Sequence, residues 1–459
     1  MPPGPDAETL ATVAAQLITQ QLQRDEHEPM RPLRSATELE ASLPLALDGS
    51  SLPWTRTIEL LGEVLAATPT TSSRRFFNQL FGGRDPVATL AELTTVISNT
   101  PMHTFKASGV QVLIEREVLR RMGAMAGMTE GDGVIAPGGS ISNLMGMMLA
   151  RNTAVAKARS EGLPGTRLCV YTSEASHYSV RKAAGVLGFG RDNVRRVPID
   201  HQGRMRPDAL ASMIEEDRAA GALPVMINAT ACTTVLGAFD PLPALADLAE
   251  ETGVWLHVDA AYGGSILLSP QHRHHLEGTA RADSLTWDAH KLLGVPLTCS
   301  ALLTRRAGVC TEHLDEPASY LFQDDAFYDP GRGSLQCARR NDALKLWLSW
   351  KHHGDEGFAR RIDTLFALAQ HVAARVEAEP RCRLMRPPAS VNVCFEVLGV
   401  DNRRLCRVLW ERGIAKIGHA RVDDRDIVRW VFVNPEVEPA EVDTVLDELL
   451  ALAEDLDGT

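Results

Sequence analysis

Short apolar runs of strand length alternate with helix-patterned segments through the middle of the chain. The apolar runs cover residues 168–173, 194–200, 224–231, 254–261 and 284–290, and the helical patterns cover residues 177–188, 207–219 and 241–252. Alternation of this kind is typical of a mostly parallel sheet with helices on both of its faces. We therefore expect an α/β protein.

Polar residues gather where these strands are expected to end. Asp259 closes the run VWLHVD, and the run SLTW is followed at once by Asp288, Ala289, His290 and Lys291. In an open parallel sheet, ligands bind just beyond the carboxyl ends of the strands. Asp259 and Lys291 are therefore expected to meet in one crevice. The further polar residues at strand ends are Ser173, His177 and Thr230.

A lysine and a carboxylate at neighbouring strand ends have a known joint use in pyridoxal phosphate chemistry. The lysine amine is a nucleophile that holds the cofactor as a Schiff base, and the substrate's amine can replace it. The carboxylate pairs with the pyridinium nitrogen and keeps it protonated. Taken alone, an Asp after an apolar strand also fits a Walker B strand or a helix cap. The chain has no GxxxxGK[ST] and no GxGxxG, so it lacks the glycine-rich phosphate-binding loop that a nucleotide or dinucleotide site needs.

A glycine-rich turn offers a binding site for the phosphate. The segment APGGSISN places Gly138 and Gly139 before a helix expected over residues 140–151. Free N–H groups and the helix dipole at such a turn attract an anion. The hydroxyls of Ser140 and Ser142 and the amide of Asn143 add donors. An ordinary helix start capped by Ser140 explains the same residues equally well.

Bulk properties exclude several classes of protein. The chain has 459 residues, 44% of them hydrophobic, which favours two or three lobes. A net charge of −12 argues against a nucleic-acid surface. The 8 cysteines form no CxxC, which indicates reduced thiols in the cytoplasm. No signal peptide or membrane-spanning run is evident, and the histidines of QHRHH lack metal-ligand spacing, so neither a membrane nor a metal site is expected.

The rest of the chain is expected to be mostly helical. Helical patterns cover residues 8–25, 57–67, 86–98, 109–127 and 438–455, and strands are expected near residues 391–397 and 427–435. Residues 72–86 read as a loop with exposed aromatic side chains. The expected organisation is a helical N-terminal arm for dimerisation at residues 1–107, a large domain at 108–345 and a small α/β domain at 346–459.

With these motifs assembled, the chain resembles the group II pyridoxal-phosphate-dependent amino-acid decarboxylases, in their glutamate and cysteine-sulfinate branch. The stretches that carry the resemblance include FFNQLFGG, APGGSISN, NATACTTVLGAFDP, VWLHVDAAYGG, YLFQDDAFYD and LQCARRNDALKLWLSWK. The resemblance implies the fold-type-I architecture, with a mostly parallel seven-stranded sheet. It also implies pyridoxal phosphate as cofactor and a homodimer with shared active sites.

The resemblance assigns roles around the cofactor. Lys291 would form the Schiff base, Asp259 would pair with the pyridinium, and His177 would stack on the ring. Tyr320, in the family's mobile loop, would reach the other subunit's active site and help protonate the substrate carbon. The remaining cofactor contacts implied are Ser140, Ser142, Asn143, Thr230, Ala261 and His290.

The resemblance also assigns residues to the substrate. Arg429 corresponds to the guanidinium that binds the α-carboxylate, since arginine gives a carboxylate two parallel hydrogen bonds. Gln79 corresponds to a contact of the distal acidic group. Phe81 resembles the sulfinate branch, because glutamate enzymes have a small hydroxyl residue there. His103 stands where the branch usually has an aromatic residue. These features favour an acid of the size of aspartate or cysteine sulfinate.

Two departures from the family pattern stand near the expected site. Asp288 replaces the usual Asn, which would repel a phosphate unless it is turned away, protonated or paired. Lys106 replaces a Glu, and it either adds positive charge near the substrate entrance or is merely solvated. The expected reaction is α-decarboxylation of an acidic L-amino acid to its amine and carbon dioxide. A decarboxylating oxidase, or another lyase or transferase in a biosynthetic pathway, is the alternative. A non-catalytic protein is disfavoured, because Lys291, Asp259 and His177 are all present.

Overall fold

The computed structural model describes residues 5–27, 30–32, 34–163, 165–322 and 326–457. The chain divides into two compact units. The small unit comprises residues 1–83, 374–385 and 394–459, and the large unit comprises residues 84–373 and 386–393. This grouping joins the N-terminal helices to the C-terminal strands. The three domains expected from the sequence are continuous segments of the chain, whereas the two units are not. The three-domain division stays a prediction.

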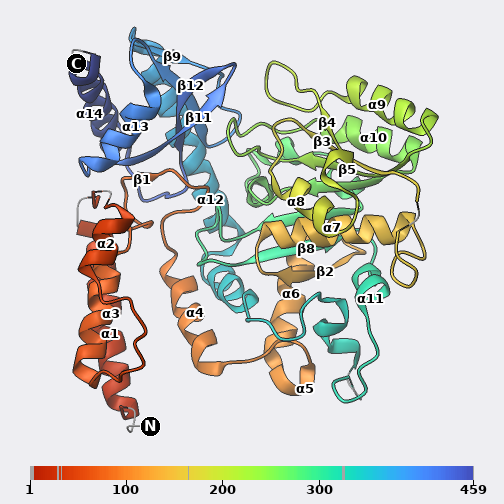
Figure 1. Cartoon of the computed structure of the whole chain (residues 1–459), viewed down its shortest axis with the longest axis horizontal. Coiled ribbons are helices and arrows are strands. Elements are labelled where there is room, and N and C mark those ends of the chain that lie inside the picture. The colour runs from red at the N-terminus through yellow and green to blue at the C-terminus, as the bar shows by residue number, and fades with distance from the viewer. Residues whose placement is uncertain (1–4, 28–29, 33, 164, 323–325, 458–459) are drawn as a thin grey trace. The chain divides into compact units, whose positions relative to one another are not determined.

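A seven-stranded sheet forms the centre of the large unit (Figure 1). Its strands are β2 (Asp132–Ala136), β8 (Ser300–Thr304), β7 (Ser284–Asp288), β6 (Trp255–Asp259), β5 (Leu223–Thr230), β3 (Leu168–Ser173) and β4 (Val194–Val197), in that spatial order. The pairs from β7 to β4 are parallel, whereas β8 is antiparallel to both β7 and β2. The expected mostly parallel α/β sheet is confirmed, with β2 and β8 as strands that the sequence did not predict.

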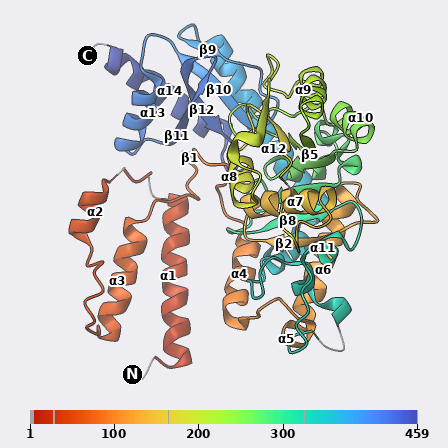
Figure 2. The ribbon, with the colours of Figure 1, turned by 45° about the vertical axis from the view of Figure 1, so that its right-hand side comes forward.

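The large unit contains a series of helices that begin at recognisable signals, and some of these helices pack on the sheet. The helices of the series are α4 (Pro86–Ser98), α5 (Phe105–Ser108), α6 (Val110–Met125), α7 (Gly139–Ala154), α8 (Ser179–Val186), α9 (Pro207–Ala219), α10 (Leu242–Thr252), α11 (Val309–Leu314) and most of α12 (Ala343–Ala378). Asp85 caps α4 by accepting from the Ala88 N–H, and Pro207 occupies the first turn of α9. Helix α7 packs across β5, β6, β7 and β8, as Figures 1 and 2 show. Its first turn therefore lies at the strand ends.

A five-stranded sheet forms the core of the small unit. Its order is β1 (Phe76–Phe77), β11 (Lys416–Val422), β12 (Arg425–Val431), β10 (Asn392–Val397) and β9 (Cys382–Leu384), and α13 (Asn402–Glu411) and α14 (Pro439–Asp457) accompany it. The expectation of exposed aromatic side chains in residues 72–86 is wrong for Phe76 and Phe77. Both are buried, because β1 pairs in parallel with β11 and the Phe77 ring packs edge-on against Trp430.

Three N-terminal helices expose apolar side chains. They are α1 (Ala7–His27), α2 (Ala36–Ser42) and α3 (Trp54–Ala67), and α1 and α3 run side by side in both views (Figures 1 and 2). No described side chain of these helices is buried, and Leu10, Leu22, Leu61 and Val64 are among the exposed apolar residues. Amphipathic helices normally bury their apolar stripe, so these helices present a face without a partner among the described residues.

The search for a helix able to cross a membrane finds none in the part of the chain that the structure describes. All eight cysteines are free thiols, and most of them are buried. Burial raises the pKa of the buried thiols, as at Cys232 and Cys394, to about 12. These thiols are therefore protonated packing residues at neutral pH.

Replacing Gly146 of α7 by Ala is predicted to destabilise the large unit. A Cβ atom there would lie 2.7 Å from the His257 ring, which is fixed inside the core. Overpacking of this kind costs about 1–3 kcal/mol. The control is Gly185→Ala in α8, whose added carbon would meet nothing closer than 3.4 Å. Chemical denaturation should show a lower unfolding midpoint for Gly146→Ala alone, and equal midpoints would contradict the packing of α7 on β6.

Candidate active site

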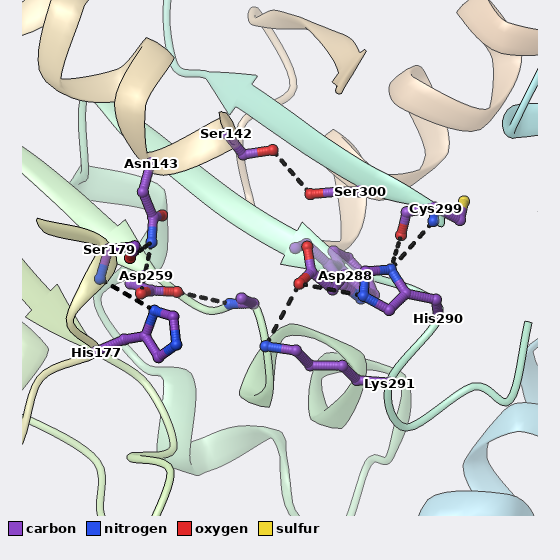
Figure 3. Close-up of polar contacts among 12 residues, drawn as sticks. Ser142, Asn143, His177, Ser179, Asp259, Asp288, His290, Lys291, Cys299 and Ser300 are labelled. Carbon is purple, nitrogen blue, oxygen red and sulfur yellow. Dashed lines mark hydrogen bonds and ion pairs between the residues drawn. The ribbon is translucent and has the colours of Figure 1, made fainter. Parts of the chain in front are cut away.

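Four neighbouring strands of the large unit each end in a polar residue. Ser173, Thr230, Asp259 and Asp288 are the last residues of β3, β5, β6 and β7, which are adjacent in the sheet. Lys291 follows β7 after a single turn. The convergence expected from the sequence is therefore observed, and Figure 3 shows Asp259, Asp288 and Lys291 around one space with His177.

The carboxylate of Asp259 is held by two donors. It is 5% exposed, so ionisation requires hydrogen bonds to replace water. Its Oδ2 accepts from Asn143 Nδ2 at 2.7 Å, and its Oδ1 accepts from the Ala261 N–H at 3.1 Å. Both contacts fix the direction in which the carboxylate faces the site. Ala261 thus acts through its backbone, by anchoring the acid.

A chain of buried polar groups lies behind Asp259. Asn143 Oδ1 is 3.1 Å from Nε2 of His257, and His257 Nδ1 is 2.7 Å from the Ser284 hydroxyl (Figure 3 shows the Asn143 end). Burial lowers the pKa of His257 to about 4, so its ring is neutral at physiological pH. A neutral ring that donates to Asn143 leaves the amide only one orientation, with its NH₂ toward Asp259. The sequence analysis missed His257, although it stands two residues before Asp259 on the same face of β6.

The side chains of two residues expected at the phosphate make contacts within the protein, and their contact with a phosphate stays a prediction. Asn143 is 2% exposed, and its Nδ2 donates hydrogen bonds to Asp259 and Ser179. Ser142 is 0% exposed and bonds to the Ser300 hydroxyl at 2.8 Å. Both side chains are therefore engaged by these contacts within the protein. Ser140, in the first turn of α7, is exposed and remains available.

Lys291 is paired with an acid on its own turn. Its Nζ lies 3.4 Å from Oδ2 of Asp288, and His290 Nε2 lies 3.6 Å from the same oxygen (Figure 3). The Lys291 side chain is 21% exposed, so its amine can be reached from solvent. The His290 Nδ1 accepts from the Cys299 N–H at 3.1 Å, and burial lowers the pKa of its ring.

Two hydroxyls at the neighbouring strand ends lack protein partners within the described ranges. The Thr230 and Ser173 hydroxyl oxygens are buried and have no hydrogen-bond partner among the described residues. His177 lies beside Asp259, and burial lowers the pKa of its ring, which favours the neutral, flat surface that stacking requires. Its Nδ1 accepts from the Ser179 N–H at 3.3 Å, which fixes the ring orientation.

The main chain of Thr230 is fixed by a second buried acid. Asp240 accepts from the Thr230 N–H at 2.7 Å and from the Met205 N–H. Burial raises the pKa of Asp240 from 3.8 to about 6. This carboxyl lies behind the end of β5 and holds the main chain of Thr230 in place.

The predicted substrate residues are divided between the two units. Arg429, Gln79 and Phe81 belong to the small unit, whereas His103 belongs to the large unit. Arg429 lies on β12 and donates to the Asn78 carbonyl oxygen. The buried Oε1 of Gln79 and Nδ1 of His103 have no hydrogen-bond partner among the described residues. Their substrate contacts stay predictions.

Tyr320 lies in an exposed part of the large unit. It is 77% exposed, which does not fit a core aromatic residue. Lys106 Nζ donates to the Tyr320 carbonyl oxygen at 3.4 Å, so Lys106 contacts this loop rather than being only solvated. The His103 carbonyl accepts from the Gly331 N–H at 3.0 Å further along the same loop. The departures at residues 103 and 106 thus lie against the segment that carries Tyr320.

The described residues fit pyridoxal phosphate. A reachable lysine amine and a buried, oriented carboxylate flank one space, and two unpartnered hydroxyls end neighbouring strands of the same sheet. The turn before α7 suits the phosphate, because Gly138 adopts a φ of 103° and Gly139 has no room for a side chain. Helix starts of this kind bind phosphate through backbone N–H groups. When bound, the cofactor supplies an electron sink for the pair left by bond cleavage at the substrate α-carbon.

Comparison with known proteins identifies the family. The pyridoxal-dependent decarboxylase conserved domain matches residues 37–398. The chain therefore belongs to the pyridoxal-dependent decarboxylase family, as the site geometry indicates. It is an amino-acid decarboxylase of fold type I with pyridoxal phosphate as its cofactor.

Relatives with assigned activities place it in one branch. The chain is 41% identical to cysteine sulfinic acid decarboxylase of Mus musculus over 443 residues, which cover 91% of this chain and 90% of that protein. It is 36% identical to glutamate decarboxylase of Drosophila melanogaster, with 94% and 90% covered. The crystal structure of mouse CSAD matches with a TM-score of 0.93 at 37% identity, covering 98% of this chain and 99% of that chain. The structure of Oryza sativa TDC with PLP and tryptamine matches with a TM-score of 0.91 at 26% identity, covering 99% of each chain.

Asp240 is predicted to give the protein a pH-dependent stability below neutral pH. Because its folded pKa is raised, the folded state binds a proton more tightly than the unfolded state. The contribution of Asp240 is fully present below about pH 4 and is lost as the pH rises through about 6, up to about 3 kcal/mol. Asp240→Asn should remove this part of the pH dependence, as measured by denaturant titrations at several pH values. Asp192→Asn, at an exposed carboxylate, is the control, and an unchanged profile in Asp240→Asn would contradict the assignment.

Proposed function

We propose that the chain decarboxylates a small acidic L-amino acid, with aspartate or cysteine sulfinate preferred to glutamate. The observation that carries this choice is its 41% identity to cysteine sulfinic acid decarboxylases, against 36% to the glutamate decarboxylase of Drosophila melanogaster. Phe81 supports it, because a bulky ring shortens a pocket that must accept the distal acid group. The products are the corresponding amine and carbon dioxide.

The site residues of the large unit each have a proposed task in this reaction. Lys291 would hold the cofactor through its amine, where the amine of the substrate can replace it. Asp259 would pair with the ring nitrogen of the cofactor, and its two hydrogen bonds fix the direction of the carboxylate. His177 stacks on the ring and limits how the substrate can rotate. Thr230 offers its unpartnered hydroxyl to the ring edge.

The substrate is bound by residues from other segments. Arg429 is proposed to bind the α-carboxylate, with the guanidinium geometry that suits a carboxylate. Gln79 is proposed to bind the distal acid group, and its buried, unpartnered Oε1 marks a side chain that still lacks a contact. His103, in the large unit, is proposed as a further contact of the substrate. These residues would hold the substrate in place, and the cofactor would supply the electron sink for the bond that breaks at the α-carbon.

Tyr320 is proposed to deliver the proton that replaces carbon dioxide. Its exposure in the single chain supports an action on another subunit's site, and the unburied faces of α1 and α3 support a homodimer. The eight free cysteines support a reducing compartment such as the cytoplasm. A tyrosine at this position also argues against the decarboxylating oxidase, which needs a site that leaves the carbon unprotonated.

A product assay on the purified protein tests the function. L-aspartate, L-cysteine sulfinate and L-glutamate are offered separately with added cofactor, and amine and carbon dioxide are measured by mass spectrometry. Amine should form from aspartate or cysteine sulfinate and should be lost in Lys291→Ala. Lys157→Ala, at an exposed lysine paired with Glu161, should keep full activity. An aldehyde with peroxide in place of the amine would show the oxidase instead.

Phe81→Ser is predicted to change the substrate preference. Removal of the ring lengthens the pocket, so the ratio of kcat/KM for glutamate over cysteine sulfinate should rise about tenfold, as expected for a methylene-sized change of fit. The matched control is Phe327→Ser, at a ring that is 74% exposed in the large unit. An unchanged ratio in Phe81→Ser would remove Phe81 from the specificity pocket.

Mixing two inactive variants tests whether the active sites are shared. Lys291→Ala lacks the cofactor lysine, and Tyr320→Phe lacks the proton donor. If Tyr320 serves the other subunit, a mixed dimer contains one site with both residues intact, and activity should reappear after subunits are exchanged. No recovery, in a mixture shown by mass spectrometry to contain mixed dimers, would place both residues in one subunit's site.

A further inference from the structure

A second buried acid shares the site with Asp259. Asp288 ends β7 and is 1% exposed. Its Oδ2 contacts Lys291 Nζ at 3.4 Å and lies 3.6 Å from His290 Nε2. Its Oδ1 is buried and has no hydrogen-bond partner among the described residues. An ionised carboxylate with half of its acceptors unused is costly in such a place, unless a nearby cation compensates it.

Asp288 also lies against the start of α7. A Cβ atom placed on Gly139 would be 2.6 Å from Asp288 Oδ2 and 3.1 Å from its Oδ1. The first turn of a helix carries unpaired N–H groups and the positive end of the dipole, which attract an anion. The Asp288 carboxylate therefore already lies beside the turn that suits the phosphate of the cofactor.

The charged groups around Asp288 come from several elements. Lys291 and His290 lie on its own turn, and burial lowers the pKa of His290, which is therefore mostly neutral at physiological pH. His177 lies across the site, and burial lowers its pKa as well. Cys299, next to β8, is a buried thiol whose pKa burial raises. Among the described residues, Lys291 is the cation in contact with Asp288, and the buried Lys345 on α12 lies near enough to act on the pKa values of His290 and Cys299.

Binding of the cofactor changes both the cationic and the anionic groups around Asp288. When the amine of Lys291 bonds to the cofactor, two of its hydrogens would leave with the carbonyl oxygen as water, so Lys291 keeps its charge but has fewer N–H groups to offer Asp288. The phosphate brings further negative charge to the start of α7. Two anions held close together in a buried site cannot both stay ionised without a large cost, and one of them takes up a proton.

We propose that Asp288 is a positioning residue that couples cofactor loading to proton uptake. Before loading, its carboxylate holds Lys291 and occupies the positive end of α7. On loading, one proton from solvent bonds to a carboxylate oxygen of Asp288, and no other bond changes in this step. The neutral carboxyl can then donate a hydrogen bond to the phosphate, so that the repulsion becomes a contact. Cofactor affinity should therefore fall as the pH rises, by up to about tenfold per pH unit.

The isosteric variant Asp288→Asn separates charge from shape. It keeps the size of the side chain and can donate a hydrogen bond at every pH, so it should bind the cofactor more tightly above neutral pH than the wild type does. Asp217→Asn is the matched control, because Asp217 is also a buried carboxylate paired with cations, Arg167 and Arg195, near the far edge of the sheet. It should keep the wild-type pH profile.

The measurement uses the full chain stripped of cofactor and titrated with pyridoxal phosphate. Absorbance of the bound cofactor gives the dissociation constant at each pH, and calorimetry in buffers of different ionisation enthalpy counts the protons exchanged. Wild type and Asp217→Asn should take up about one proton more per cofactor than Asp288→Asn. The readout needs no substrate, so it stands apart from the proposed substrate preference.

Equal proton counts and parallel pH profiles in wild type and Asp288→Asn would overturn the proposal. Weaker binding by Asp288→Asn throughout the pH range would also overturn it, since the carboxylate would then help the cofactor directly. If Asp288→Asn does not fold, Asp288→Ser removes the charge with a smaller side chain, and the same difference in proton count is required of it.

Discussion

The site depends on how the Asp259 carboxylate is held inside the protein. A buried carboxylate that loses its water needs hydrogen bonds to its charged form, and the fold supplies them from two directions. One comes from the Ala261 N–H directly after β6, and the other comes from Asn143 on α7. Because Asn143 is itself oriented by His257, the helix, the strand and the acid are joined in one buried network.

This network also explains why α7 must lie close to the sheet. Gly146 faces His257 and leaves no room for a side chain, and Gly139 faces Asp288 in the same way. The close packing sets the start of α7 beside the ends of β6 and β7. The anion-binding end of the helix and the lysine therefore meet without any contribution from a flexible loop. A lysine, an acid and a phosphate-binding turn on rigid elements are what pyridoxal chemistry requires.

Much of this was predictable from sequence, because strand ends and helix signals are local features. The strands ending at Asp259 and Asp288, and the helix beginning at Pro207, follow from apolar periodicity and its interruptions. Strand β2 was missed because Gly131 and Gly133 resemble breakers. In the structure a Cβ on Gly133 would lie 2.5 Å from the Leu302 carbonyl oxygen, so glycine permits the close approach of β8.

The protein contacts of the site residues could not be read from their motif alone. Ser140, Ser142 and Asn143 share one motif, but residues one and two apart on a helix point to different sides. Only tertiary packing decides that Ser142 and Asn143 turn toward Ser300 and Asp259. His257 was missed for the complementary reason, since a buried histidine in a strand gives no local signal of its partners. Phe76 and Phe77 became buried through pairing with β11, far away in sequence.

The most direct test of the account is to locate the cofactor chemically. The loaded protein is reduced with borohydride, which turns the lysine–cofactor bond into a stable secondary amine, then digested and mapped by mass spectrometry. The account predicts a pyridoxyl group on the peptide that contains Lys291, and none on that peptide after reduction of the cofactor-free protein. A pyridoxyl group confined to another lysine, or to none, would contradict the assignment of the site.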